Sequence, residues 1–142
     1  SRSKPGVLRG LHYQFEPAQG KLVSCLRGHI LDVVVDIRQG SPSYGKHVSI
    51  ELNGDSVSYL WVPPGFAHGF LVLGDDPADV LYKVDSYYNK AGEAGLAWND
   101  PDLNISWPSP SELIVSDKDA QQPSFQEYRD DPKFYFSGNG PK

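Results

Sequence analysis

Short apolar segments that alternate with glycine and proline turns constrain the fold of this chain most. Between Gly20 and Tyr87, six segments carry the β-branched and aromatic side chains that favour strands, namely 21–27, 29–38, 47–52, 56–62, 66–73 and 80–87. Turn residues separate them, as at Gly28 and at Pro63-Pro64-Gly65. Many short strands at this spacing are typical of an all-β protein, either an antiparallel sandwich or a barrel.

Two further expectations concern a turn and the C-terminal end. Asn53-Gly54 lies between two of these segments and predicts a β-hairpin, because this dipeptide suits the favoured two-residue turn. Helix is expected only in the last third of the chain, where Ser111 to Ala120 is compatible with the start of a short helix or with a last turn. The polar, proline-containing residues that follow are expected to be peripheral.

Length and charge argue against several classes of protein. With 142 residues, 39% of them hydrophobic, the chain can form one folded domain. Its net charge of -5 argues against general binding to nucleic acid, which needs a basic face. Cys25 is the only cysteine, so no intrachain disulfide is possible. The sequence contains no apolar run of membrane-spanning length and no signal peptide, so a cytoplasmic location is the expectation.

The stretch from Gly6 to Gln14, GVLRGLHYQ, is the first candidate for function. Arg9 and His12 would lie on opposite faces of a regular strand, because side chains alternate between faces. Gly10 lies between them and permits a bulge that would turn both side chains into one cavity. His12 could then carry protons near neutral pH. A half-buried strand with a surface histidine is equally compatible with this pattern.

The spacing of the histidines bears on metal binding. His12, His29, His47 and His68 are the only histidines, and no two form the HxH pair usual in a jelly-roll metal site. Residues 64–68, PGFAH, resemble the second half of a cupin metal motif whose first half is absent, so no metal is expected. His68 enters an apolar strand and needs either a ligand or a buried partner, and both interpretations stay open.

Tyrosines and one aspartate complete the candidate set. Tyr82, Tyr87 and Tyr88 lie close together in LYKVDSYYN. A tyrosine can stack on a ring, donate a hydrogen bond or act as a general acid, although such clusters more often serve packing. Asp119 could orient a histidine, but a solvated acid in a turn is the simpler interpretation of the sequence alone.

Seven motifs taken together resemble one family, and they occur in its order from Ser1 to about Pro123. They read GVLRGLHYQ, QGKLV, DVVVDIR, PPGFAHGFLVL, LYKVDSYYN, WNDPDLNISWP and SDKDA. The chain thereby resembles the dTDP-4-dehydrorhamnose 3,5-epimerase family. The resemblance implies a cupin-like antiparallel jelly roll with short C-terminal helical segments, a homodimer, and no metal or organic cofactor. It places the epimerase domain at residues 1–123 and leaves residues 124–142 as a peripheral tail.

The resemblance also implies an activity and roles for particular residues. The expected reaction inverts C3 and C5 of dTDP-4-dehydro-6-deoxy-D-glucose through an enolate and gives dTDP-4-dehydro-L-rhamnose. His12 matches the general base, Asp119 the partner that orients it, and Tyr82 the general acid. Further residues match positions that contact the substrate, namely Arg9, Lys21, His68, Tyr88, Glu93 and Lys118. Arg9 is expected near the diphosphate or sugar, and Lys21 near the C4 carbonyl.

One departure from the family leaves alternatives open. A segment with the motif GDxRGxFxE, which precedes the position of Ser1 in the family and contributes to the nucleotide site, is not present in this sequence. Nucleotide binding is the property that this departure puts in question. The alternatives are an epimerase that inverts C3 or C5 only, a jelly roll that binds a nucleotide sugar without turnover, and a metal-dependent cupin.

Overall fold

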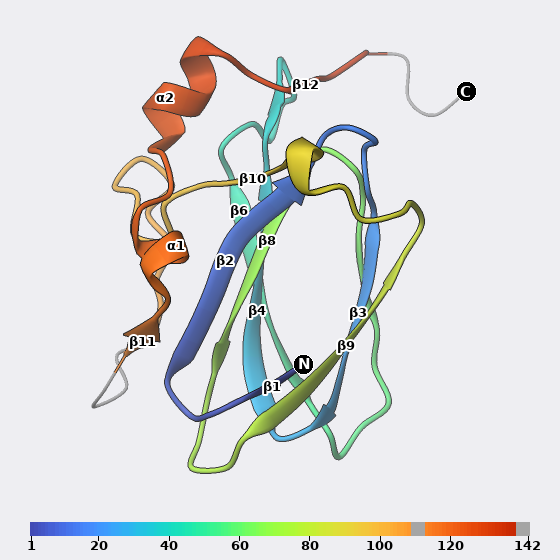
Figure 1. Cartoon of the computed structure of the whole chain (residues 1–142), viewed down its shortest axis with the longest axis vertical. Coiled ribbons are helices and arrows are strands. Elements are labelled where there is room, and N and C mark those ends of the chain that lie inside the picture. The colour runs from blue at the N-terminus through green and yellow to red at the C-terminus, as the bar shows by residue number, and fades with distance from the viewer. Residues whose placement is uncertain (109–112, 139–142) are drawn as a thin grey trace.

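Two antiparallel sheets form the body of the protein in the computed structural model, which describes residues 1–108 and 113–138 (Figure 1). The smaller sheet has the order β1 (Arg2–Ser3), β9 (Ala78–Val84), β3 (Lys21–Arg27), β7 (Leu60–Val62). The larger has the order β10 (Glu93–Gly95), β2 (Val7–Gln14), β8 (Phe66–Val72), β4 (His29–Asp36), β6 (His47–Asn53), and β11 (Ile114–Val115) pairs with β2.

Short elements complete the fold. They are β5 (Arg38–Gln39), which pairs with β12 (Phe134–Tyr135), the 3-10 helix η1 (Lys90–Gly92), and the helices α1 (Asp117–Ala120) and α2 (Phe125–Asp130). The expected antiparallel jelly roll with short C-terminal helices is thus confirmed. Among the residues described, no helix has both the length and the apolar character needed to cross a membrane.

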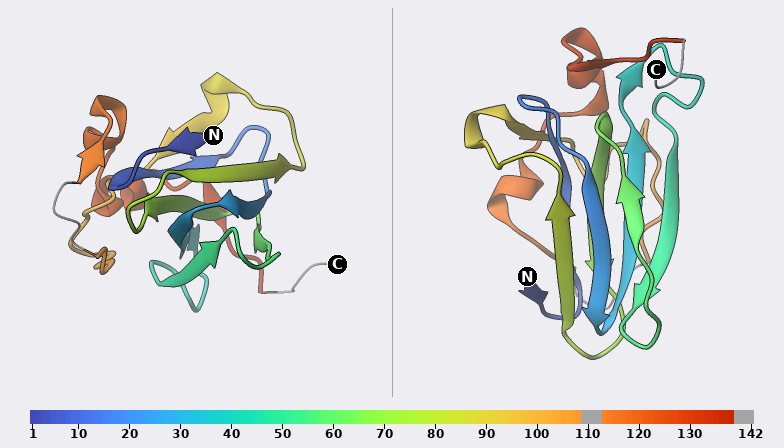
Figure 2. Two further views of the ribbon diagram at one scale, coloured as in Figure 1. Left: turned by 90° about the horizontal axis from the view of Figure 1, so that it is seen from below. Right: turned by 90° about the vertical axis from the view of Figure 1, so that its right-hand side faces the viewer.

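The larger sheet has a core on each of its faces, as the views in Figure 2 help to follow. One core lies between the two sheets and includes Val34, Phe70 and Val80. The other contains Leu31, Val33 and Val35 of β4 and is covered by residues from the C-terminal third. Strand β4 is therefore buried on both faces, which explains why its apolar residues occupy consecutive positions on either side of Asp32 instead of alternating with exposed polar ones.

The expected hairpin at Asn53-Gly54 is wrong. Strand β6 pairs with β4, and β7 pairs with β3 of the other sheet, so this turn passes the chain from one sheet to the other. The Asn53 side chain closes the turn by accepting hydrogen bonds from the backbone N–H groups of Asp55 and Ser56, at 3.0 and 3.1 Å. The dipeptide predicted a turn correctly, but the choice of strand partner is a tertiary property.

The segment expected to be a peripheral tail is in part a core element. The Phe125 and Tyr128 side chains of α2 are 1% and 4% exposed, and the Tyr128 hydroxyl donates to the Ile37 carbonyl at 2.6 Å. Ser124 and Glu127 form a capping box that starts α2. The apolar face of this helix was too short to recognise in a polar sequence. Helix α1 is shorter than expected, and positions 111 and 112 of the predicted helix lie outside the described residues.

Candidate active site

A bulge in β2 brings two candidate residues to one cavity. The pairing of β2 with β8 shifts in register between Arg9 and His12. Gly10 has φ +120°, and a Cβ there would lie 2.7 Å from the Cα of Gly69, so glycine is required by both conformation and space. Arg9 and His12 consequently line the same cavity, which is one of the two arrangements that the sequence left open.

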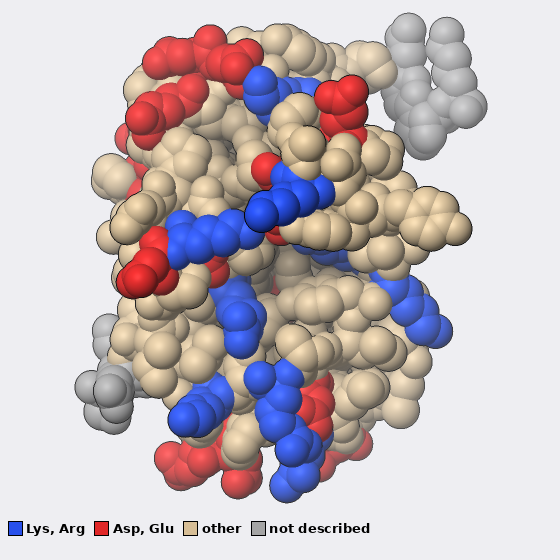
Figure 3. Space-filling model, viewed as in Figure 1, with Lys and Arg blue, Asp and Glu red and all other residues tan. Residues whose placement is uncertain are grey.

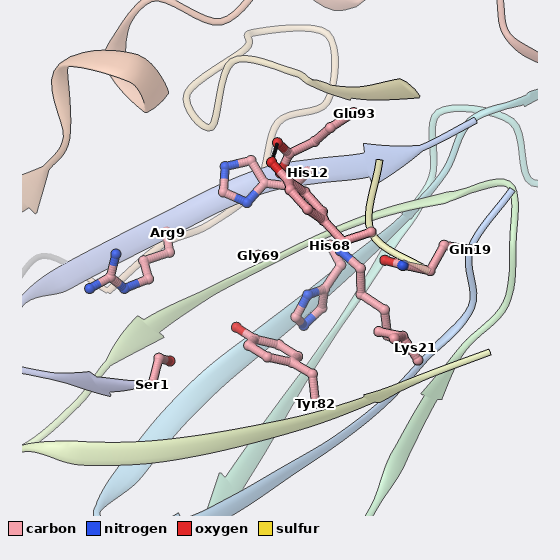
Figure 4. Close-up of a pocket in the computed structure, with 11 residues that line it drawn as sticks. Ser1, Arg9, His12, Gln19, Lys21, His68, Gly69, Tyr82 and Glu93 are labelled. Atoms are coloured by element: carbon pink, nitrogen blue, oxygen red, sulfur yellow. Dashed lines mark hydrogen bonds between the residues drawn. The ribbon is translucent and has the colours of Figure 1, made fainter. Parts of the chain in front are cut away.

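The cavity lies between the two sheets and has a volume of about 340 Å³ (Figure 4). His12 projects into it from β2, His68 from β8, and Tyr82 from β9 of the opposite sheet. Lys21 of β3 is also at its wall. The full set of lining residues is Ser1, Arg9, His12, Gln19, Lys21, His68, Gly69, Tyr82, Val84, Tyr88 and Glu93.

His12 is bonded to Asp119 although 107 positions separate them in the sequence. The distance from His12 Nε2 to Asp119 Oδ1 is 2.6 Å, and the other carboxylate oxygen accepts the Gly10 N–H at 3.0 Å. Ser116 caps helix α1 and holds Asp119 in place by accepting its backbone N–H. Because an ionised carboxylate only accepts, Nε2 is the donor and Nδ1 is left for other partners.

The environment of His12 favours the neutral form of its ring, because it lowers the pKa of the imidazole below its value in water. Burial lowers the pKa of His12, and the positive charges of Lys21 and Lys118 act in the same direction. The hydrogen bond and the charge of Asp119 raise this pKa but do not offset burial fully. The histidine is thus oriented by a carboxylate and unprotonated at neutral pH, which are the two properties that a general base needs.

Tyr82 lies on the opposite sheet and is protonated under all ordinary conditions. Burial raises the pKa of its phenol strongly, the negative charge of Asp32 adds to the effect, and Arg9 opposes it. Its ring packs edge-on against His68, with ring centroids 5.8 Å apart and an interplanar angle of 84°. The phenol can therefore donate a proton or a hydrogen bond from the wall of the cavity formed by the smaller sheet.

His68 has a buried partner, which answers the question that the sequence left open. Its Nε2 donates to Asp32 Oδ2 at 2.9 Å and lies 2.8 Å from Oδ1, and the two side chains are 3% and 0% exposed. Sequence reasoning missed Asp32. The available signal was an acid inside the β-branched run 32–37, since a buried carboxylate requires a partner.

Two cations, Arg9 and Lys21, line the cavity. Burial lowers the pKa of Lys21, while Glu93 and Asp32 raise it and limit the shift. The Arg9 Nε donates to the Ser3 hydroxyl at 2.8 Å, which fixes the position of the guanidinium. Figure 3 shows Lys and Arg side chains gathered across the face viewed in Figure 1, around β2, although the net charge is -5. This face suits an anionic ligand.

Tyr88, Glu93 and Lys118 form the rim of the cavity. The Tyr88 hydroxyl donates to Glu93 Oε2 at 2.9 Å, and the Lys118 ammonium lies 3.3 Å from the same oxygen. Burial raises the pKa of Glu93, but these two partners outweigh it, so the pKa lies below its usual value. Lys118 belongs to this rim and not to the lining of the cavity.

Within residues 1–108 and 113–138, no three His, Cys, Asp or Glu side chains are grouped as a metal site.

The fold is a jelly roll, and its cavity holds a histidine bonded to an aspartate on one side and a tyrosine on the facing sheet. The chain belongs to the dTDP-4-dehydrorhamnose 3,5-epimerase family, whose model matches residues 1–127. It is 51% identical over 126 residues to the dTDP-4-dehydrorhamnose 3,5-epimerase of Shigella flexneri, covering 88% of this chain and 68% of the relative. The chain spans about two thirds of such relatives, with 63% for the one from Sinorhizobium fredii.

Solved structures agree with this assignment. The dTDP-6-deoxy-D-glucose-3,5-epimerase of Legionella pneumophila, in complex with dTDP-4-keto-L-rhamnose, superposes with a TM-score of 0.92 and is 44% identical; the match covers 96% of this chain and 72% of that one. A 3′-monoepimerase from Streptomyces bikiniensis, in complex with dTDP-quinovose, has a TM-score of 0.85 and 36% identity, over 92% of this chain and 66% of the other. The family and its cupin-like fold are thus as the sequence motifs indicated.

Proposed function

We propose that this protein inverts C3 and C5 of dTDP-4-dehydro-6-deoxy-D-glucose to give dTDP-4-dehydro-L-rhamnose, in the biosynthesis of dTDP-L-rhamnose or a related deoxysugar. The observation that carries the proposal is that His12 of the larger sheet, bonded to Asp119 of α1, faces Tyr82 of the smaller sheet across a cavity that Arg9 and Lys21 also line. Inversion at carbon requires a proton acceptor on one face of the sugar and a proton donor on the opposite face. The two sheets provide this two-sided arrangement.

The first step is removal of a proton next to the ketone. The nitrogen of His12 that does not face Asp119 accepts the proton from C3 or C5, and the electron pair of the C–H bond moves toward the C4 carbonyl oxygen. Asp119 holds the ring in the required orientation and stabilises the imidazolium that forms. The product of this step is an enolate, whose negative charge needs a cation nearby.

The second step returns a proton on the other face. Lys21 is the cation proposed to stabilise the enolate oxygen, because it lies in the cavity wall and is partly desolvated there. Tyr82 donates its phenolic proton to the carbon from the side opposite His12. Solvent then restores the proton to the phenolate, and the His12 imidazolium releases its proton to solvent. The substrate already carries the ketone, so these two reaction steps require no redox cofactor and no metal.

The remaining residues of the site are proposed to hold the nucleotide sugar. Arg9 is suited to the diphosphate because a guanidinium can bind two phosphate oxygens at once. Tyr88 exposes 65% of its surface at the rim and can stack on a ring of the ligand. Glu93 and Lys118 position Tyr88 and each other through the bonds at the rim. His68 is proposed to contact the sugar from the inner wall.

Exchange of carbon-bound hydrogen in deuterium oxide tests this function. The protein is incubated with dTDP-4-dehydro-6-deoxy-D-glucose, and deuterium at C3 and at C5 is counted by NMR. Label at both carbons with the L-rhamno product is expected. Label and inversion at one carbon would identify the alternative of a single-carbon epimerase, an activity that the 3′-monoepimerase of similar structure represents. Binding without any exchange would identify a non-catalytic nucleotide-sugar protein.

We also propose that two copies of the chain associate. The outer face of the smaller sheet presents large apolar side chains to solvent, with Leu26, Trp61 and Leu81 exposed by 58%, 49% and 39%. A second copy that covers this face would remove them from water, which is favourable. Light scattering of the wild type and of Leu81→Lys tests this, and a wild type of monomer mass would contradict it.

A cytoplasmic location stays a prediction, which cell fractionation tests.

A further inference from the structure

Asp32 is a carboxylate buried among apolar side chains with a single partner. It is 0% exposed in the middle of β4, and its neighbours along the strand include Ile30 and Val34 of the core between the sheets. In the part of the chain that the structure describes, its one hydrogen bond is to His68, and Oδ1 accepts none. Burial of an acid with so few donors is unfavourable for folding.

A second acid on the same strand shows what a structural carboxylate receives here. Asp36 is 2% exposed and accepts five hydrogen bonds, from the backbone and guanidinium of Arg38 and from the hydroxyls of Ser41 and Ser43. Asp36 closes a turn at the end of β4 and is not part of the cavity wall. The contrast indicates that Asp32 serves its one partner and not the stability of the strand.

That partner occupies a central place in the site. His68 of β8 is directly opposite His12 of β2 in the sheet, so the two imidazoles leave the same face side by side. The His68 ring also packs against the edge of Tyr82 from the opposite sheet. His68 therefore lies between His12 and Tyr82 in the wall of the cavity, as Figure 4 shows, and the orientation of its ring affects the space that the sugar can occupy.

The hydrogen bond to Asp32 decides which nitrogen of His68 faces the ligand. The carboxylate accepts from Nε2, so Nε2 carries a proton and points away from the cavity. Nδ1 has no hydrogen-bond partner among the residues described. We propose that Asp32 is a positioning residue, which fixes the proton of His68 on Nε2 and thereby presents Nδ1 as an acceptor for a hydroxyl group of the hexose.

The ligand in this inference, the hexose, rests on the proposed epimerase function. The orientation of the His68 ring rests only on its hydrogen bond to Asp32. Two histidines that are cross-strand neighbours each have their own buried aspartate, Asp119 for His12 and Asp32 for His68. The first pair moves a proton in the proposed mechanism. The pair His68–Asp32 transfers no proton, and it determines instead how the hexose lies against Tyr82 and His12.

Nitrogen-15 NMR of the ligand-free wild type tests the orientation directly. Long-range proton–nitrogen correlations distinguish a protonated from an unprotonated ring nitrogen, and comparison with His68→Gln assigns the signals. A protonated Nε2 across the neutral pH range is expected, and Asp32→Asn should remove this preference. An unprotonated Nε2 in the wild type would overturn the proposal, and this measurement stands even where the variant does not fold.

Kinetics with the nucleotide sugar tests the consequence for catalysis. Asp32→Asn is expected to lower kcat by about 10- to 100-fold, the scale of one hydrogen bond to a charged group. dTDP lacks the hexose and therefore does not make the proposed contact with His68. Its affinity should change by less than about twofold, because a substitution weakens only the interactions that it removes. The matched control is Asp36→Asn, another buried acid of β4, which should lower stability and leave kcat near the wild-type value.

The outcomes separate this inference from the proposed function. Equal kcat values in Asp32→Asn and Asp36→Asn, both folded, would overturn the positioning role while the epimerase function stands. Loss of dTDP affinity in Asp32→Asn would likewise overturn it, because the residue would then act on the whole ligand site. If the wild type has a protonated His68 Nε2 but incorporates no deuterium into the sugar, the epimerase function is refuted and the orientation of His68 is not.

Discussion

Replacement of Asp119 by asparagine is the sharpest test of the base. The carboxylate of Asp119 makes two bonds, one to His12 Nε2 at 2.6 Å and one from the buried Gly10 N–H at 3.0 Å. Both partners are donors, so an ionised carboxylate satisfies both. An asparagine has only one acceptor oxygen and must place its NH₂ group against one of the two.

Either orientation of the amide leaves a mismatch whose size can be worked out. If the oxygen stays with Gly10, the NH₂ group faces Nε2, which must then be unprotonated, and the proton moves to Nδ1. The nitrogen that should accept the substrate proton is then occupied, and the base is lost. If the oxygen faces His12 instead, the buried Gly10 N–H loses its acceptor, which costs about 1–3 kcal/mol.

We therefore expect Asp119→Asn to lower kcat at least about 10²-fold, on the scale of a lost general base. The same exchange beside the histidine of a serine protease lowers kcat by about 10⁴, also through the wrong tautomer. The pH profile should change as well. Asp119 raises the pKa of His12 against the lowering by burial, so its removal should move the acid limb of kcat to lower pH.

The assay is the rate of L-rhamno product formation between pH 5 and 9, with the fold checked by circular dichroism. The matched control is Asp117→Asn on the same helix, where the side chain is exposed and touches neither Gly10 nor His12. A folded Asp119→Asn variant with wild-type kcat and an unmoved acid limb would refute the assignment of His12 and Asp119 as base and partner.

Three further perturbations test the acid, the cofactor requirement and the packing of the C-terminal helix. Tyr82→Phe should still exchange deuterium next to the ketone but form little inverted sugar, because only the hydroxyl donor is lost; native inversion would make Tyr82 a packing residue. Activity should survive exhaustive EDTA, since protein groups supply every proton and charge in the proposed mechanism; loss on chelation and recovery with one divalent ion would contradict this. Tyr128→Phe should cost about 1–3 kcal/mol of unfolding free energy by leaving the Ile37 carbonyl unpaired, with denaturant melts as the measure.

The sequence alone determined the fold class and the position of the bulge. Gly and Pro turns between β-branched runs are local signals, and they gave the strand β3 at Lys21–Arg27 with its observed bounds. Gly10 between Arg9 and His12 predicted that alternation would fail there, because a residue without a side chain tolerates the backbone needed for a bulge. The family motifs added candidate residues that no periodicity could supply.

Tertiary structure alone decided which residues meet. Asn53-Gly54 predicted a turn, but the partner of each flanking strand depends on which sheet buries its apolar face. Asp32 could be identified only as an acid in an apolar run, and its bond to His68 joins residues 36 positions apart. Asp119 and His12 meet because α1 packs against the bulge of β2, and Tyr82 faces them because the two sheets close over one cavity. Such contacts are set by burial of side chains from distant segments, and this burial exists only once the chain has folded.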